Sequence, residues 1–238
     1  MSAPAPARRE VFVTGATGHV GSALCRALVA RGHSVNALVR PASAVLLARD
    51  CLAVLGDALD ASSYAEAIAP ADTLVHLVGT PKPSPWKARQ FHEVDGASLV
   101  AALEAAARAS VRHLVYVSVA QPAPVMRAYV RVRAECEARI RASGLPATIL
   151  RPWYVLGPGR RWPLALRPLY RLAERLPATA EGARRLGLVR LEEMVAAMIW
   201  AIEHPPAAGV RVLDVPAIRN GRLLESIPAP APALPGRN

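Results

Sequence analysis

The stretch Val11-Phe-Val-Thr-Gly-Ala-Thr-Gly-His-Val-Gly21 decides the fold of this chain. A short β-rich run leads into three glycines with the spacing G-x-x-G-x-x-G, and Val20, Leu24 and Leu28 then recur at helical spacing until Gly32. In such a strand–turn–helix, the first glycine permits the tight turn, the second lets the backbone approach a phosphate, and the third allows close packing of helix on strand. The N-terminus of the helix supplies oriented N–H donors, so the stretch predicts a dinucleotide site.

Strands and helices alternate along the first 150 residues. The pattern predicts strands at residues 10–14, 34–39, 51–55, 73–78, 111–118 and 147–150. It predicts helical segments near residues 41–49, 62–69, 91–109 and 125–143. This order is typical of βαβ units with right-handed crossovers. We therefore expect an α/β fold of the Rossmann type, with a doubly wound parallel sheet.

The rhythm changes after Arg151, where prolines and glycines interrupt the pattern. A short helix near residues 168–176, a helix at 191–203 and a strand at 210–215 are predicted beyond this point. We expect a flexible N-terminus (1–9), a single NAD(P)-binding domain (10–218) whose region 152–218 includes a small C-terminal cap, and a Pro/Ala-rich tail (219–238).

Composition excludes several classes of protein. The 238 residues fit one sizeable domain, and the three cysteines are too few and too scattered for a disulfide scaffold or a zinc site. No uncharged apolar stretch approaches the ~20 residues that a bilayer span needs, and the N-terminus has no apolar signal core. We expect a cytoplasmic protein without a metal.

The net charge of +11 is concentrated in one part of the chain, because residues 126–190 hold 14 arginines against four glutamates. The basic segment 160–190 could contact an anionic membrane surface, a protein partner or an acidic or lipid-like substrate, or could be a solvated surface. A cap helix that buries its leucines over the nucleotide site is the preferred interpretation of residues 168–176. No nucleic-acid partner is expected, since no binding motif accompanies the charge.

The end of the second predicted strand bears on the choice of cofactor. An acidic residue there would hold the 2′-hydroxyl of the NAD ribose, but the strand runs into Arg40. An arginine suits a 2′-phosphate through charge-assisted hydrogen bonds, so the residue favours NADP, and NAD is the weaker alternative. An arginine that is merely exposed on the surface is the remaining interpretation.

Further motifs extend the pattern. They are Leu55-Gly-Asp57, His76-Leu-Val-Gly79, Val115-Tyr-Val-Ser118, and Ile149-Leu-Arg-Pro152 followed by Gly157-Pro-Gly159. Together with the glycine loop, they make residues 10–215 resemble the short-chain dehydrogenase/reductase superfamily, in its extended and atypical NAD(P)H-binding branches. The resemblance includes NmrA-like proteins and the nucleotide-binding accessory subunit of respiratory NADH dehydrogenase.

This resemblance implies positions for the cofactor. The residues that would bind it are Gly15, Thr17, Gly18, His19 and Val20 of the loop, Arg40, Asp57 and Ala58 near the adenine, Val78 and Gly79 beside its ribose, Arg133, and Pro152 next to the nicotinamide.

The resemblance also implies a catalytic set of a serine, a tyrosine and a lysine four residues after the tyrosine. Ser118 and Tyr129 match the first two, but the third position is Arg133. Arginine keeps the positive charge of lysine without its compact shape. One interpretation is an NADP-dependent oxidoreductase on an unidentified carbonyl or hydroxyl substrate, with Tyr129 as acid/base, Ser118 polarising the carbonyl and Arg133 holding the cofactor. The other is a non-catalytic dinucleotide-binding sensor or scaffold that acts through a partner or a membrane surface.

Overall fold

A computed structural model describes residues 8–123, 125–157 and 186–220 of the chain. Its centre is a parallel sheet with the strand order β3-β2-β1-β4-β5-β6-β9. The strands are β1 (Glu10–Thr14), β2 (Ser34–Val39), β3 (Leu52–Leu55), β4 (Thr73–His76), β5 (His113–Val117), β6 (Ala147–Leu150) and β9 (Val210–Leu213). The chain order reverses between β1 and β4, as in a doubly wound fold. The predicted Rossmann-type α/β fold is confirmed.

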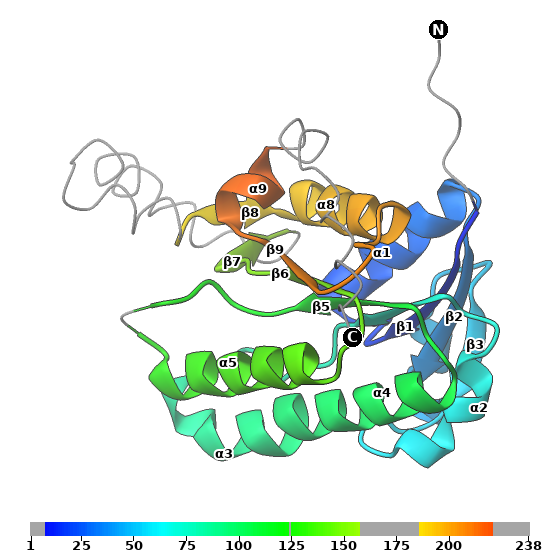
Figure 1. The fold of residues 1–238 in the computed structure, drawn as a ribbon, viewed down its shortest axis with the longest axis horizontal. Coiled ribbons are helices and arrows are strands. Elements are labelled where there is room, and N and C mark those ends of the chain that lie inside the picture. Colours follow the sequence, from blue (N-terminus) through cyan, green and yellow to red (C-terminus); the bar gives the residue numbers. More distant parts are fainter. Residues whose placement is uncertain (1–7, 124, 158–185, 221–238) are drawn as a thin grey trace, which may run out of the picture.

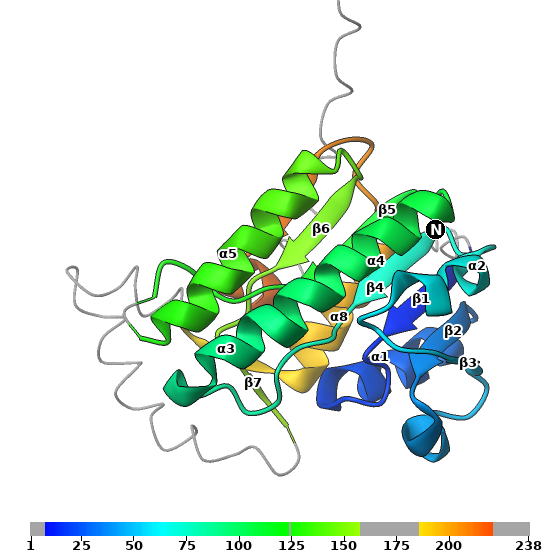
Figure 2. The same cartoon turned by 90° about the horizontal axis from the view of Figure 1, so that it is seen from below.

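Helices cover both faces of the sheet, which gives three layers (Figure 1). One face carries α1 (His19–Ala30), α8 (Leu191–Glu203) and α9 (Val215–Arg219). Figure 2 shows the other face, with α2 (Ala65–Ile68), α3 (Ala88–Gln90), α4 (Ala97–Arg108) and α5 (Arg127–Ala142). The remaining helical turns are η1 (Pro41–Leu46), η2 (Ala61–Ser63), η3 (Pro85–Lys87) and the π-helical η4 (Phe91–Gly96).

Side chains that alternate along each strand supply the cores of the two faces. Val11 and Val13 of β1 pack with Leu24 and Met198 from the α1/α8 layer, whereas Phe12 between them packs with the α4/α5 layer. This period of two explains why the strands of a sheet that is covered on both faces are continuously apolar.

Several predicted segments differ from the observed elements, and the strands expected at 73–78 and 111–118 are shorter, since β4 ends at His76 and β5 spans His113–Val117. The helix expected at residues 41–49 is the short η1, which buries none of its residues and so has no packing to support further turns. The strand expected to reach Val215 ends at Leu213, because Asp214 accepts a hydrogen bond from the Ala217 N–H and starts α9.

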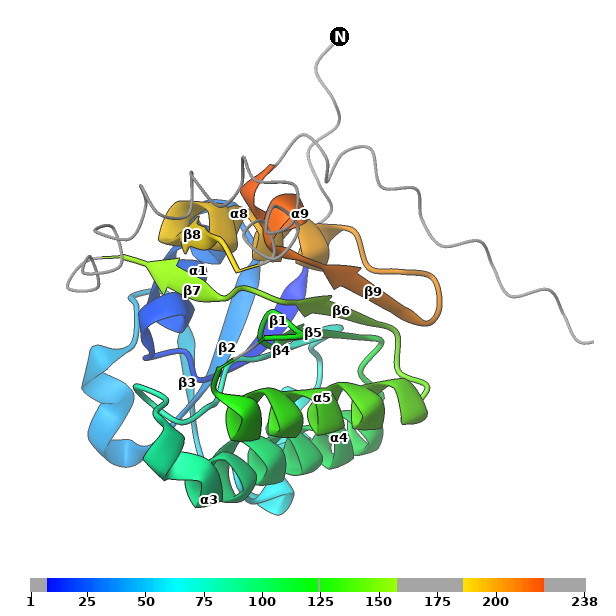
Figure 3. The same ribbon diagram turned by 90° about the vertical axis from the view of Figure 1, so that its left-hand side faces the viewer.

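The region after β6 returns to the main layers. Strand β9 pairs with β6, from Ala147↔Val210 to Leu150↔Leu213, and α8 packs on α1. Beside them, β7 (Tyr154–Leu156) and β8 (Leu188–Arg190) form a separate two-stranded parallel sheet (Figure 3). The predicted helix at 168–176, most of the basic segment 160–190 and the tail from 221 lie outside the described residues. Within the described ranges, no helix is long and apolar enough to cross a membrane.

Candidate functional site

A cavity of about 490 Å³ opens at the carboxyl ends of β1, β2, β3 and β4, where the order of strands reverses. Open α/β sheets bind ligands at such a point. The residues that line it are Gly15, Thr17, Gly18, Leu38, Val39, Arg40, Ser43, Gly56, Asp57, Ala58, Leu59, Leu77, Val78, Gly79, Pro81 and Val94. Eight of the residues predicted to bind the cofactor are among them.

The turn between β1 and α1 requires glycine at two positions. Gly15 has φ +77°, and a Cβ there would lie 2.9 Å from the carbonyl carbon of Leu77. At Gly21 a Cβ would overlap the carbonyl oxygen of Gly15. Helix α1 begins after Gly18 without a side-chain cap, so the N–H groups of its first turn are left for a ligand.

The ends of β2 and β3 form the outer part of the cavity. Arg40 is exposed, and the backbone N–H of Ser43 donates to its carbonyl oxygen at 2.8 Å, which turns η1 towards the cavity. Sequence reasoning did not identify Ser43 as a cavity residue. Its position three residues after Arg40 was a usable signal, because its hydroxyl could donate a second hydrogen bond to a phosphate. Asp57 uses its carboxylate locally, where it accepts a hydrogen bond from the Leu59 N–H at 3.0 Å.

Arg133 lies behind the wall that Gly79 forms. Its Nη1 donates to Tyr116 Oη at 2.9 Å and to the carbonyl oxygen of Val117 at 3.0 Å, while Nη2 donates to Asp95 Oδ1 at 2.6 Å. Its side chain is 8% exposed, and a Cβ on Gly79 would overlap Nη2. Burial alone would lower the pKa of Arg133, but Tyr129, Tyr116 and Asp95 raise it well above its usual value, so the group stays charged.

Tyr129 stands at the start of α5, on the same side of the helix as Arg133. The guanidinium Cζ of Arg133 is 5.2 Å from the centre of the Tyr129 ring and 5.6 Å from that of Tyr116. Phe91 packs against Tyr129 with 5.0 Å between ring centres. The structure therefore brings the predicted acid/base residue next to a buried cation.

Ser118, at the end of β5, belongs to a separate buried network. Its hydroxyl donates to Glu137 Oε1 at 2.7 Å, and Gln121 donates to the same oxygen at 2.6 Å. Arg151 donates to both carboxylate oxygens of Glu137, at 2.9 Å and 2.5 Å. Because the one hydroxyl proton of Ser118 is used by Glu137, only its lone pairs remain for a substrate in this arrangement.

Besides Arg133, three other predicted cofactor residues do not line the cavity with their side chains. The His19 ring lies against Gly157, where a Cβ would overlap it. Val20 packs on the α1/α8 core, and Pro152 is buried, with its carbonyl accepting a hydrogen bond from the Ala120 N–H. The backbone of His19 and Val20 still forms the first turn of α1.

Asp95 and Glu137 are two further functional candidates that sequence reasoning missed. Both are buried carboxylates, with Asp95 0% and Glu137 3% exposed. Glu137 follows Arg133 by four residues and Tyr129 by eight, so helical spacing on one face of α5 was a usable signal. Asp95 offered none, because its partners Thr80 and Arg133 are distant in sequence.

The donors around the cavity suit the phosphate groups of a nicotinamide dinucleotide. The turn that Gly15 makes with its positive φ leads into the first turn of α1, which offers N–H groups for a diphosphate, and Gly79 adds no side chain to the wall. Arg40 and Ser43 supply a cation and a hydroxyl at the outer end.

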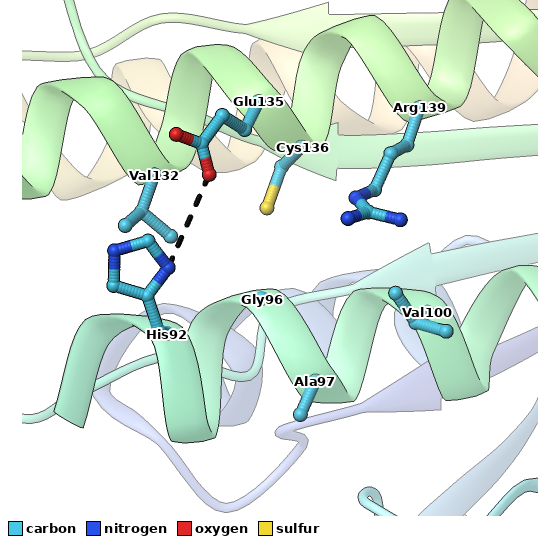
Figure 4. Close-up of a pocket in the computed structure, with 8 residues that line it drawn as sticks. All are labelled: His92, Gly96, Ala97, Val100, Val132, Glu135, Cys136 and Arg139. Atoms are coloured by element: carbon cyan, nitrogen blue, oxygen red, sulfur yellow. Dashed lines mark ion pairs between the residues drawn. The ribbon is translucent and has the colours of Figure 1, made fainter. Parts of the chain in front are cut away.

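A second hollow of about 240 Å³ lies between α4 and α5 (Figure 4). His92 Nδ1 and Glu135 Oε2 face each other across it at 4.0 Å, with Cys136 between the helices. Burial raises the pKa of the Cys136 thiol, so it is not an activated nucleophile. Within the described residues, no cluster of side chains could hold a metal ion.

Known proteins that are similar to this chain include an NAD(P)H-binding family and two reductases. Residues 15–161 match a family model described as NAD(P)H-binding. The chain is 31% identical to 3-diazoavenalumate denitrifying reductase of a Streptomyces species, with 86% of this chain and 76% of the relative covered. It is 29% identical to ceramide reductase of Caulobacter vibrioides, with 88% and 66% covered.

Solved structures agree on the fold. The Bordetella bronchiseptica enzyme WbmH in complex with NAD+ superposes with a TM-score of 0.65 at 21% identity, over 87% of this chain and 75% of that one.

Proposed function

Because the chain belongs to the NAD(P)H-binding short-chain dehydrogenase/reductase family, we propose that it is an NADP(H)-dependent oxidoreductase that reduces a carbonyl group. The observation that carries the proposal is the position of Tyr129 beside the buried cation Arg133, which itself lies against the Gly79 wall of the dinucleotide cavity. Two relatives are named as reductases, which favours reduction.

Each residue has a role in this proposal. The first turn of α1 and the glycines of the loop bind the diphosphate, and Arg40 with Ser43 binds a 2′-phosphate. A nicotinamide, when bound, would supply the hydride. Tyr129 supplies the proton from its phenol oxygen, and the charge of Arg133 stabilises the phenolate that is left. Ser118, which donates to Glu137, holds the end of β5 beside the site and has only its lone pairs left for a substrate.

The test has two stages. NADPH and NADH are titrated against tryptophan fluorescence, and the protein is then assayed for NADPH consumption with a panel of ketones and aldehydes. Long-chain ketones lead the panel because one relative is named for ceramide. We expect binding with preference for NADPH, followed by turnover of a carbonyl compound.

Binding without turnover of any carbonyl compound would contradict the enzymatic proposal and favour the dinucleotide-binding sensor. The replacement of lysine by Arg133 is the feature consistent with that second function. Failure to bind either nucleotide would overturn both functions.

A further inference from the structure

Asp95 is the most completely buried carboxylate near the dinucleotide cavity, with 0% exposure. It accepts hydrogen bonds from Arg133 Nη2 at 2.6 Å, from the Thr80 backbone N–H at 2.9 Å and from the Thr80 hydroxyl at 2.6 Å. An ionised carboxylate is stable at such depth only when its charge is paired and its lone pairs accept hydrogen bonds. Asp95 satisfies both conditions.

The partners of Asp95 are parts of the cavity wall. Thr80 follows directly after Gly79 and precedes Pro81, and both of these neighbours line the cavity. Arg133 lies immediately behind Gly79, where Nη2 fills the space of a Cβ. The Asp95 carboxylate therefore holds the wall segment in two ways. It accepts hydrogen bonds from Thr80 within the segment, and it holds Arg133, which packs against Gly79.

The other contacts of Arg133 leave Asp95 as the group that sets its position. Nη1 is held by Tyr116 Oη and by the Val117 carbonyl oxygen, both neutral acceptors, so Asp95 is the charged partner. Without the carboxylate, the guanidinium would be a buried cation with no counter-charge at hydrogen-bond distance among the described residues. Such a group moves towards solvent or towards the cavity.

The π-helical geometry of η4 explains how Asp95 comes to lie behind the cavity wall. Residues Phe91–Gly96 form a π-helical turn that continues into α4, and Asp95 sits at its end next to the cavity residue Val94. A π-helical turn shifts the following side chains around the helix axis, and such turns are frequent at functional sites.

We propose that Asp95 is a positioning residue of the dinucleotide site: it holds the Gly79–Pro81 wall and keeps the charge of Arg133 behind it, and so sets the affinity for NADPH. This inference rests on the proposed function and adds to it a residue that touches neither cofactor nor substrate.

The experiment compares Asp95→Asn with Glu203→Gln. Glu203 is a matched control, because its side chain is 6% exposed and pairs with Arg31 at 2.8 Å and His33 at 3.2 Å. It lies at the opposite edge of the sheet, near the starts of β1 and β2. Both variants lose one buried carboxylate that pairs with an arginine, so both lose unfolding free energy in urea.

We expect Asp95→Asn to weaken NADPH binding, measured by fluorescence titration, by about tenfold or more. Glu203→Gln should bind NADPH like the unaltered protein. If turnover is available, Asp95→Asn should raise the KM for NADPH more than it lowers kcat, and leave the KM for the carbonyl substrate unchanged. Equal NADPH affinity in the two variants would overturn the inference while leaving the proposed function intact.

Thr80→Val keeps the test decisive should Asp95→Asn fail to fold. It removes the hydroxyl that donates to Asp95 but keeps the backbone N–H and the side-chain shape. We expect a weaker NADPH affinity by about threefold or more, and an unchanged affinity would contradict the role of Asp95. If the unaltered protein binds neither nucleotide, the proposed function fails, and this inference fails with it.

Discussion

Individual residues act on the dinucleotide cavity through the charge or the volume that they place at its wall. Gly15 and Gly79 allow close packing behind the cavity wall, because a Cβ would clash with the neighbouring backbone at Gly15 and with the buried guanidinium at Gly79. Arg40 places a charge at the outer end, and Tyr129 places a phenol next to the buried cation Arg133. Replacements of Arg40 and of Tyr129 should separate the choice of cofactor from the chemical step.

Arg40→Asp should shift the cofactor preference from NADPH towards NADH. A charge-assisted hydrogen bond to a phosphate contributes about 1.5–3 kcal/mol, so the ratio of NADPH to NADH affinity should fall by about 10- to 100-fold. Fluorescence titration of both nucleotides measures the ratio. Arg49→Asp is the control, because Arg49 is also exposed in the same connection but does not line the cavity. A ratio unchanged by Arg40→Asp would exclude a 2′-phosphate contact.

Tyr129→Phe should lower kcat by about two to four orders of magnitude, because it removes the proton donor. The affinity for NADPH should stay within about twofold, since the phenylalanine ring keeps the packing on Phe91. Steady-state kinetics and titration on the same sample separate the two effects. Retention of full turnover would remove Tyr129 from the mechanism.

At the scale of elements, helix α5 joins the ends of two strands. Tyr129, Arg133 and Glu137 follow one another at intervals of four residues on its inner face. Arg133 binds the carbonyl oxygen of Val117, and Glu137 binds the hydroxyl of the next residue, Ser118. Through Arg151, Glu137 also holds the end of β6. The helix therefore fixes the carboxyl edge of the sheet where the site lies.

Glu137→Gln should lower the unfolding free energy by about 2 kcal/mol or more, since it leaves Arg151 without its counter-charge. Urea unfolding measures the change. Glu135→Gln, on the half-exposed side of the same helix, should stay within about 0.5 kcal/mol of the parent. Equal losses in both variants would mean that the buried network around Glu137 adds nothing to the free energy of unfolding beyond what an exposed carboxylate adds.

The sequence predicts those site residues whose positions are set by neighbours in the chain, and misses those whose contacts are distant in sequence. The glycine loop and Arg40 were found because a local turn and a strand end determine their positions. The side-chain environment of Ser118 was not foreseen, since Glu137 and Arg151 reach it only when α5 and β6 are in place. For the same reason Asp95 went unnoticed, and Arg133 was expected to face the cofactor directly, whereas it lies behind Gly79.

At the scale of the whole molecule, two of the histidines that are buried in the described residues, His76 and His113, link stability to pH. Burial, with a smaller contribution from nearby arginines, lowers the pKa of His76 and of His113 to about 3. His76 is held between Thr14 and Ser98, and His113 contacts Thr148. Both are neutral in the folded protein at pH 5 to 7, whereas in the unfolded chain they bind a proton below about pH 6.5.

Stability should therefore fall as the pH is lowered from 7.5 to 5, by about 2 kcal/mol for each buried histidine. Urea unfolding at a series of pH values measures the slope. His113→Asn should reduce the slope by about half, whereas His92→Asn, at an exposed position, should leave it unchanged. A flat profile in the parent protein would show that these histidines are protonated in the folded state.

The distribution of the site along the chain has a consequence for recombination. Every residue that lines the dinucleotide cavity in the described structure lies between positions 15 and 94, whereas Ser118 and Tyr129 come later. Cofactor choice and chemistry could therefore be inherited separately, by joining the first part of one relative to the second part of another. The pair Asp95–Arg133 crosses that junction. Any crossover between these two positions must bring together a carboxylate and a cation that suit each other, or the hybrid would carry an unpaired buried charge at the wall of its own cofactor site.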